Sequence, residues 1–254
     1  SWETADSIEI LKYIKSRWWK TLWIVNVVGS TISRLTDFGM FTRAWTEVWV
    51  ASTKAFLSQI SAILLLALYF GKRNNLSHAH FGKILSEFKE IPEKIEQIIK
   101  ESEKIKNIAK EISEYKNFFY LWRHYQLPIA SEWSLKLKEI SYLHSESYWA
   151  WELKHWPLAL IQEDFPSVMC IPWDFLFDKN MSTMQEIKAR KWKILAITDK
   201  DIESDRTIKI PETIDELYPF LSVVAAQLLA YFVADKLWKD IDKPRNLAKS
   251  VTVK

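Results

Sequence analysis

The chain has 254 residues, and 35 Lys and Arg against 32 Asp and Glu give it a formal net charge of +3. This length predicts two ordinary domains or one large α/β domain with a sizeable core. Charges of both signs are interspersed, which excludes a nucleic-acid stripe and a polybasic membrane arm, and the single cysteine, Cys170, excludes an internal disulfide and a cysteine-based zinc site.

The first third of the chain predicts a helix, a strand and a second helix. Glu3–Arg17 has the pattern of an amphipathic helix, and Thr21–Val28 reads as a buried strand. Ser52–Phe70 predicts a long apolar helix whose first two residues are cap candidates. Its most apolar run, Ala62–Phe70, is far shorter than the ~18 residues of a membrane span.

The remainder alternates helical and strand-like patterns. Residues 83–116 are rich in Lys and Glu and predict exposed helices. Further expected elements are strands at Asn117–Leu121, Val168–Ile171 and Ile194–Thr198, helices at Met184–Arg190 and Glu216–Leu237, and an aperiodic end at Asp240–Lys254 with a turn at Pro244–Asn246. Strands that alternate with helices predict an α/β fold with parallel sheets.

The glycine and tryptophan counts are unusual. The chain has 4 glycines and 14 tryptophans, and together they come close to the ordinary glycine share of about 7%. The pair Trp18-Trp19 and also Trp192 and Trp238 fall just after predicted helices, where the chain usually needs glycine in the left-handed conformation. Trp2 stands at a helix start where a close backbone approach also favours glycine.

Two interpretations fit these counts. One is a tryptophan-rich core, although Trp18-Trp19 in a polar turn suits it poorly. The other is that most or all of the tryptophans are glycines, because some bacterial lineages read UGA as glycine and a table that reads UGA as Trp would substitute one for the other. UGG codons at these positions would overturn the second interpretation.

Five segments carry a family resemblance once Trp is read as Gly. They are Ser1–Ser7 (SGETADS), Ala44–Phe56 (AGTEVGVASTKAF), Ser134–Tyr148 (SLKLKEISYLHSESY), Glu152–Leu160 (ELKHGPLAL) and Pro244–Lys254 (PRNLAKSVTVK). Together they resemble the isomerase part of the glutamine–fructose-6-phosphate aminotransferase (isomerizing) family. The first segment is shared by many sugar isomerase (SIS) domains, whereas Ser134–Tyr148 and the tail are specific to this family.

The resemblance implies two SIS-type lobes, each a parallel sheet flanked by helices, with ligand at the carboxyl ends of the strands. We expect a first lobe over residues 1–76, truncated at its N-terminus, a helical connection over 77–108, a second lobe over 109–239 and an active-site tail over 240–254. The family's N-terminal glutaminase domain is absent from the sequence. Lys254 stands where the family usually has an acidic residue.

Two hydroxyl-bearing loops are candidate sugar-binding segments. From spacing alone, Ser1 and Thr4, and likewise Ser52, read as helix N-caps. The resemblance implies instead that Ser1 and Thr4 belong to a sugar-phosphate cradle at a helix N-terminus, and that Val50 and Ser52 line the sugar site.

Lys136 and Glu139 lie three residues apart on one predicted helix face. The ordinary interpretation is a solvated ion pair. The resemblance implies that Glu139 is the base that moves a proton between C1 and C2 of the sugar, and that Lys136 holds the open-chain hydroxyls or the developing charge.

Two further residues gain a role only from the resemblance. His155 would otherwise be structural, and Lys249 one more exposed lysine. The resemblance makes His155 the ring-opening acid/base, supplied by a neighbouring subunit of a homodimer. It makes Lys249 the Schiff-base lysine, with backbone contacts from Ala248. The other histidines have no metal-ligand spacing, so no metal or organic cofactor is expected, and Cys170 reads as a core residue.

The expected function is therefore conversion of fructose 6-phosphate and glutamine-derived ammonia to glucosamine 6-phosphate by a cytoplasmic homodimer, with no nucleic-acid or membrane partner. Two alternatives are a plain sugar-phosphate isomerase and a non-enzymatic SIS module that binds sugar phosphates. Neither has an evident use for the lysine-bearing tail, which favours the aminotransferase.

Overall fold

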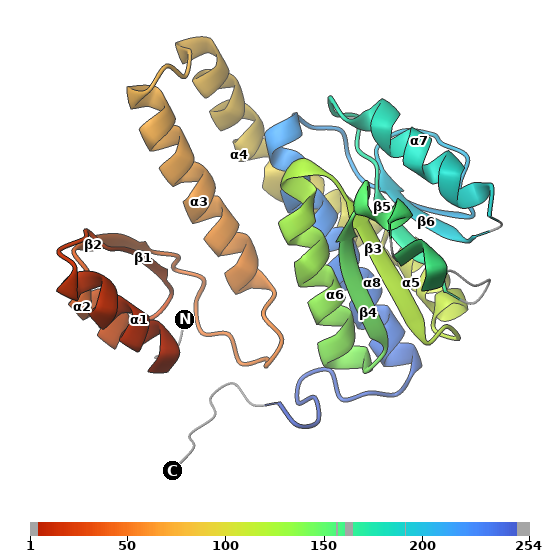
Figure 1. The fold of residues 1–254 in the computed structure, drawn as a ribbon, viewed down its shortest axis with the longest axis horizontal. Coiled ribbons are helices and arrows are strands. Elements are labelled where there is room, and N and C mark those ends of the chain that lie inside the picture. Colours follow the sequence, from red (N-terminus) through yellow and green to blue (C-terminus); the bar gives the residue numbers. More distant parts are fainter. Residues whose placement is uncertain (1–4, 156, 161–164, 191, 248–254) are drawn as a thin grey trace. The chain divides into compact units, whose positions relative to one another are not determined.

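The computed structural model describes residues 5–155, 157–160, 165–190 and 192–247, and the chain divides into two compact units (Figure 1). Of the described residues, those up to residue 81 form the first unit and those from 82 to 247 form the second. Each unit has its own parallel sheet, as the alternating pattern predicts.

The first unit holds a two-stranded sheet and three helices. Its elements are α1 (Ala5–Ser16), β1 (Leu22–Val25), α2 (Thr31–Leu35), β2 (Phe38–Phe41) and α3 (Lys54–Arg73), followed by the start of α4 (His78–Lys100). The predicted helix and strand at the start of the chain are confirmed as α1 and a shorter β1. The strand was expected to be buried, but only Val25 of β1 is buried, because no strand among the described residues covers its second edge. The strand β2 was not predicted, because its four residues include Gly39 and no β-branched side chain.

The strand β1 has one paired and one unpaired edge. The carbonyl oxygens of Thr21 and Val25 accept hydrogen bonds from Phe38 (3.3 Å) and Thr42 (2.9 Å) on the side of β2. Because backbone groups alternate between the two edges, those of Leu22 and Ile24 face away from β2. No strand among the described residues pairs with that edge.

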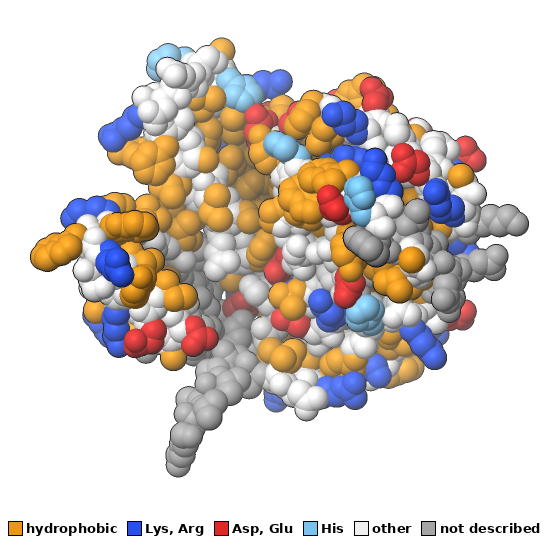
Figure 2. Space-filling view, in the orientation of Figure 1, with side chains coloured by type: hydrophobic (Ala, Val, Ile, Leu, Met, Phe, Trp, Pro, Cys, Tyr) orange, Lys and Arg blue, Asp and Glu red, His pale blue; other side chains and the backbone are white. Residues whose placement is uncertain are grey.

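The helix α3 is held at its start by a carboxylate rather than by the predicted Ser52 or Thr53 caps. Glu47 accepts hydrogen bonds from the backbone N–H groups of Thr53 (2.9 Å) and Ala55 (3.3 Å), and the Thr53 side chain makes no cap bond. Much of the apolar surface of α3 is exposed, including Ile63 (Figure 2).

In the part of the chain that the structure describes, two helical segments are long and apolar enough to cross a membrane by length and composition alone, Lys54–Arg73 and Asp215–Lys236. The second segment contains α8 (Tyr218–Lys236) and is mostly buried inside its unit, as a core helix would be. Such helices are weak evidence for a membrane span.

The second unit is built on a five-stranded, fully parallel sheet of order β4-β3-β5-β6-β7. After α4 its elements are α5 (Ser102–Ile112), β3 (Asn117–Trp122), η1 (His124–Gln126), α6 (Leu127–Ser141), β4 (His144–Trp149), η2 (Glu152–Lys154), η3 (Pro157–Leu160), β5 (Ser167–Cys170), α7 (Phe177–Lys188), β6 (Ile194–Thr198), β7 (Arg206–Lys209), η4 (Asp215–Leu217) and α8. Helices α5, α6 and α8 lie on one face of the sheet and α7 on the other (Figure 1).

The core of this unit explains why its central strands are apolar throughout. Phe119 and Leu121 of β3 pack with Met184 and Ile187 of α7 on one face. The alternate residues of β3, such as Tyr120, are equally buried on the other face. A strand covered on both faces reads as a continuous apolar run, and this run is what predicted β3, β5 and β6 correctly.

Candidate active site

The helix α6 carries Lys136 and Glu139 on adjacent turns, as their spacing predicts. Lys136 is only 4% exposed, and its ammonium group contacts the Glu139 carboxylate and lies 3.5 Å from Glu132 Oε1. The pair is therefore largely buried rather than a solvated surface pair. Glu139 is the more accessible partner, with 22% of its side chain exposed.

Reciprocal serine hydrogen bonds fix α6 against the neighbouring strand β4. The Ser134 hydroxyl donates to the Ser145 carbonyl (2.7 Å), and the Ser145 hydroxyl donates to the Ser134 carbonyl (2.7 Å). Both residues are buried, and Ser131 pairs with Ser147 at 2.9 Å further along the same contact. These hydrogen bonds hold α6, the helix that carries Lys136 and Glu139, at a fixed register on β4.

The chain leaves β4 and reaches His155 at the end of η2. Its backbone N–H donates to Glu152 (3.0 Å), and its side chain is exposed while Leu153 anchors the turn in the core. This exposed position leaves the His155 imidazole accessible from solvent.

Near the end of β4, a hydrogen bond from Tyr148 to Glu146 raises the pKa of Tyr148 to about 12.

The other predicted site residues fall into two groups. Val50 and Ser52 are half-buried in the loop before α3, in the first unit. Ser1, Thr4, Ala248 and Lys249 lie outside the described residues. The structure thus brings Lys136 and Glu139 together, and the remaining predicted residues have no described contact with that pair.

A hollow that the sequence analysis missed lies at the carboxyl ends of β3 and β4. Its volume is about 600 Å³, and its lining includes Arg123, Trp149, Trp151 and Phe175. Burial lowers the pKa of Arg123, whose guanidinium donates to Thr183 Oγ1 at 2.8 Å. This edge of a parallel sheet is the usual ligand-binding side.

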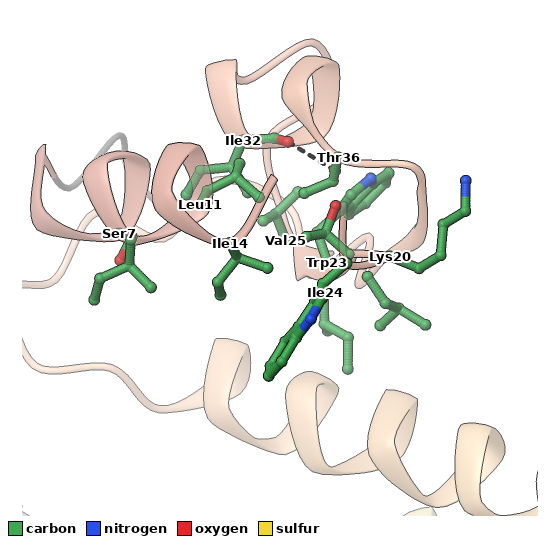
Figure 3. Close-up of a pocket in the computed structure, with 13 residues that line it drawn as sticks. Ser7, Leu11, Ile14, Lys20, Trp23, Ile24, Val25, Ile32 and Thr36 are labelled. Atoms are coloured by element: carbon green, nitrogen blue, oxygen red, sulfur yellow. Dashed lines mark hydrogen bonds between the residues drawn. The ribbon is translucent and has the colours of Figure 1, made fainter. Parts of the chain in front are cut away.

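A second groove, of about 530 Å³, lies in the first unit along the unpaired edge of β1 (Figure 3). Leu11 and Ile14 of α1 and Ile24 of β1 are part of its largely apolar lining. Among the residues that the structure describes, no group of three or more His, Cys, Asp or Glu side chains could hold a metal ion.

Comparison with known proteins gives a family match. The SIS domain model matches residues 1–69 and 111–234. Glutamine--fructose-6-phosphate aminotransferases [isomerizing] from Chlorobaculum tepidum and Caldanaerobacter subterraneus are 42% and 44% identical to this chain over its whole length. The chain spans only 42% and 43% of those relatives.

Solved structures agree with this match. The C-terminal domain of glucosamine-fructose-6-phosphate aminotransferase from Francisella tularensis is 34% identical, with a TM-score of 0.91, over 95% of this chain and 70% of that domain. A putative phosphosugar isomerase from Clostridium difficile shares the fold at 18% identity and a TM-score of 0.80.

Proposed function

We propose a function from the premise that this chain belongs to the SIS domain family and, within it, to the isomerase part of the glutamine–fructose-6-phosphate aminotransferases. The resemblance carried by the five sequence segments is thereby confirmed. We propose that the chain is the isomerase half of an enzyme that converts fructose 6-phosphate and ammonia to glucosamine 6-phosphate. The observation that carries this proposal is sequence identity above 40% over the entire chain.

The ion pair on α6 suits the proton transfer that this reaction needs. Transfer from C1 to C2 of the open-chain imine requires a carboxylate held rigidly beside both carbons. Glu139 is fixed by the buried ammonium group of Lys136, which Glu132 also approaches. In this proposal Glu139 takes the proton from C1 and returns it at C2, and Lys136 stabilises the charge that develops on the sugar oxygens.

The remaining roles complete the proposed reaction. His155, supplied by the second subunit of a homodimer, protonates the ring oxygen so that fructose 6-phosphate opens. Lys249 condenses with the C2 carbonyl and releases water, and ammonia then displaces the lysine amine. Ser1, Thr4, Val50 and Ser52 hold the sugar phosphate, and Ala248 adds backbone contacts beside Lys249.

Ammonia requires a source, and the proposed source is a glutaminase domain upstream in a longer polypeptide. The curated relatives are more than twice the length of this chain, which supports this part of the proposal. Such an enzyme would work in the cytoplasm without metal or organic cofactor. We also propose a first lobe over residues 1–76, a helical connection over 77–108, a second lobe over 109–239 and an active-site tail over 240–254.

The decisive experiment compares Lys249→Ala with the unsubstituted longer polypeptide, supplied with glutamine and fructose 6-phosphate. The variant is expected to lose glucosamine 6-phosphate formation while glutamine hydrolysis persists. Unchanged product formation would remove Lys249 from its role, and no product from the unsubstituted protein would overturn the function. The 254 residues alone are expected to make no glucosamine 6-phosphate from glutamine and to show at most weak isomerisation.

A further inference from the structure

Three tryptophans occupy a backbone conformation that suits glycine. Trp18, Trp45 and Trp238 have φ angles of 61°, 57° and 55°. In this left-handed region the Cβ atom of an L-residue crowds its own backbone, and a bulky side chain there is a genuine outlier. Glycine adopts the same angles without that contact.

The surroundings of these three side chains offer nothing that would compensate the strain. Trp18, Trp45 and Trp238 are 94%, 86% and 95% exposed. An indole is a large apolar group that normally gains stability by burial. The backbone disfavours tryptophan at these positions, and the packing gives no reason for it.

The end of α8 shows what residue the chain requires at position 238. The N–H of Trp238 donates to the carbonyl of Asp235, and the N–H of Lys239 donates to that of Ala234, both at 3.0 Å. These two bonds form a Schellman motif, in which the residue at position 238 is the left-handed one and is usually glycine. The end of α1 has the equivalent of the first of these bonds, because the N–H of Trp18 donates to the carbonyl of Lys15 at 3.0 Å.

Two buried tryptophans fit their places poorly as well. The indole N–H groups of Trp122 and Trp133 have no hydrogen-bond partner among the described residues, and their ring centroids are only 4.1 Å apart. A buried indole usually donates a hydrogen bond, so both side chains are poorly accommodated where they lie.

The structure also corrects one of the predicted positions. Trp19 was expected in the left-handed turn after a helix, and its neighbour Trp18 takes that conformation instead. Trp192 was expected in such a turn as well, and its side chain is buried in the core, where its ring packs edge-to-face on Phe119.

We propose that the protein made in its source cell has glycine at Trp18, Trp45 and Trp238 and, through the same codon, at all fourteen tryptophan positions. The source cell would decode the codon UGA as glycine, whereas the printed sequence gives it as tryptophan. This single difference accounts for both the exposed strained residues and the poorly accommodated buried ones. The inference does not depend on the proposed function, because the φ angles and hydrogen bonds that carry it lie outside the candidate site.

The test is peptide mass mapping of the protein isolated from its source, with the codons read from the same cells. Glycine masses and UGA codons at positions 18, 45 and 238 are the expected result. Tryptophan masses and UGG codons there would overturn the proposal. Glycine at these three positions with tryptophan at 122, 133 or 192 would overturn its extension to all fourteen.

A second measurement uses recombinant chains and needs no source cells. The chain with all fourteen positions changed to glycine is expected to give a cooperative thermal transition at a higher temperature than the tryptophan chain. A matched pair of chains changes only Trp18, Trp45 and Trp238, in one chain to glycine and in the other to alanine, which removes the indole but keeps Cβ. The glycine chain is expected to melt at the higher temperature. Equal melting temperatures of the two chains would contradict the argument from backbone conformation.

Discussion

Lys136 and Glu139 form an ion pair between adjacent turns of α6, with the Lys136 side chain buried and the Glu139 side chain partly exposed. Lys136→Met would leave the carboxylates of Glu132 and Glu139 facing each other without the cation between them. Removing one partner of a buried pair costs about 3–5 kcal/mol, and we expect a loss of that order in the free energy of urea unfolding. Glu139→Gln leaves Lys136 with Glu132 and should cost clearly less; equal losses would contradict this account of the pair.

The proposed catalytic role of Glu139 separates it from its neighbour Glu132, which approaches the same ammonium group. In the longer polypeptide, Glu139→Gln is expected to lower kcat for glucosamine 6-phosphate formation by about 10²–10⁴ with glutamine hydrolysis retained, since a missing general base costs that much. Glu132→Gln makes the same change of charge two turns away on α6 and should lower kcat far less. Equal losses from both variants would argue for a structural role only.

The left-handed turn after α8 predicts a gain in stability from one substitution. Trp238→Gly should raise the free energy of unfolding by about 1 kcal/mol, because a side chain in this conformation costs about 1–2 kcal/mol. Trp173→Gly is the control, since Trp173 is also exposed but has no positive φ. Thermal melting of the two variants beside the parent distinguishes relief of backbone strain from simple loss of an exposed indole.

Asp37 joins the starts of β1 and β2 and predicts an acid dependence of the first unit. Its carboxylate accepts hydrogen bonds from the Thr21 hydroxyl (2.8 Å) and N–H (2.9 Å), which lower the pKa of Asp37. Its contribution to stability is therefore present above its unfolded-state pKa of about 4 and is lost as pH falls through the lower folded value. Asp37→Asn should melt below the parent at pH 7, and the gap should narrow as the pH falls below about 4; a gap independent of pH would contradict this.

The unpaired edge of β1 predicts self-association of the 254-residue chain. An open strand edge is a template for pairing with another chain. Leu22→Pro removes an N–H that faces the open edge and should reduce association in analytical ultracentrifugation. Trp23→Pro instead removes an N–H that faces β2, so it should destabilise the first unit without reducing self-association. Unchanged association in Leu22→Pro would show that another surface is responsible.

The sequence predicted the interior strands and the long helices because each has a strong apolar pattern. β4 and β7 were missed since they form the two edges of the sheet, where His144–Trp149 and Arg206–Lys209 keep polar residues on the exposed side. The Lys136–Glu139 spacing could be read directly from a helical pattern. The burial of Lys136 could not, because it depends on how α6 packs within the unit, including on α8, which lies far along the chain.

The turn after α8 also carries information of another kind. Its two main-chain hydrogen bonds place position 238 in the left-handed conformation that glycine usually occupies at a helix end. Tyr142 takes the same conformation (φ 64°) at the end of α6, so a left-handed φ alone does not name a residue. The conformation at position 238 therefore shows which codon to read, and the nucleotide sequence decides how it was decoded.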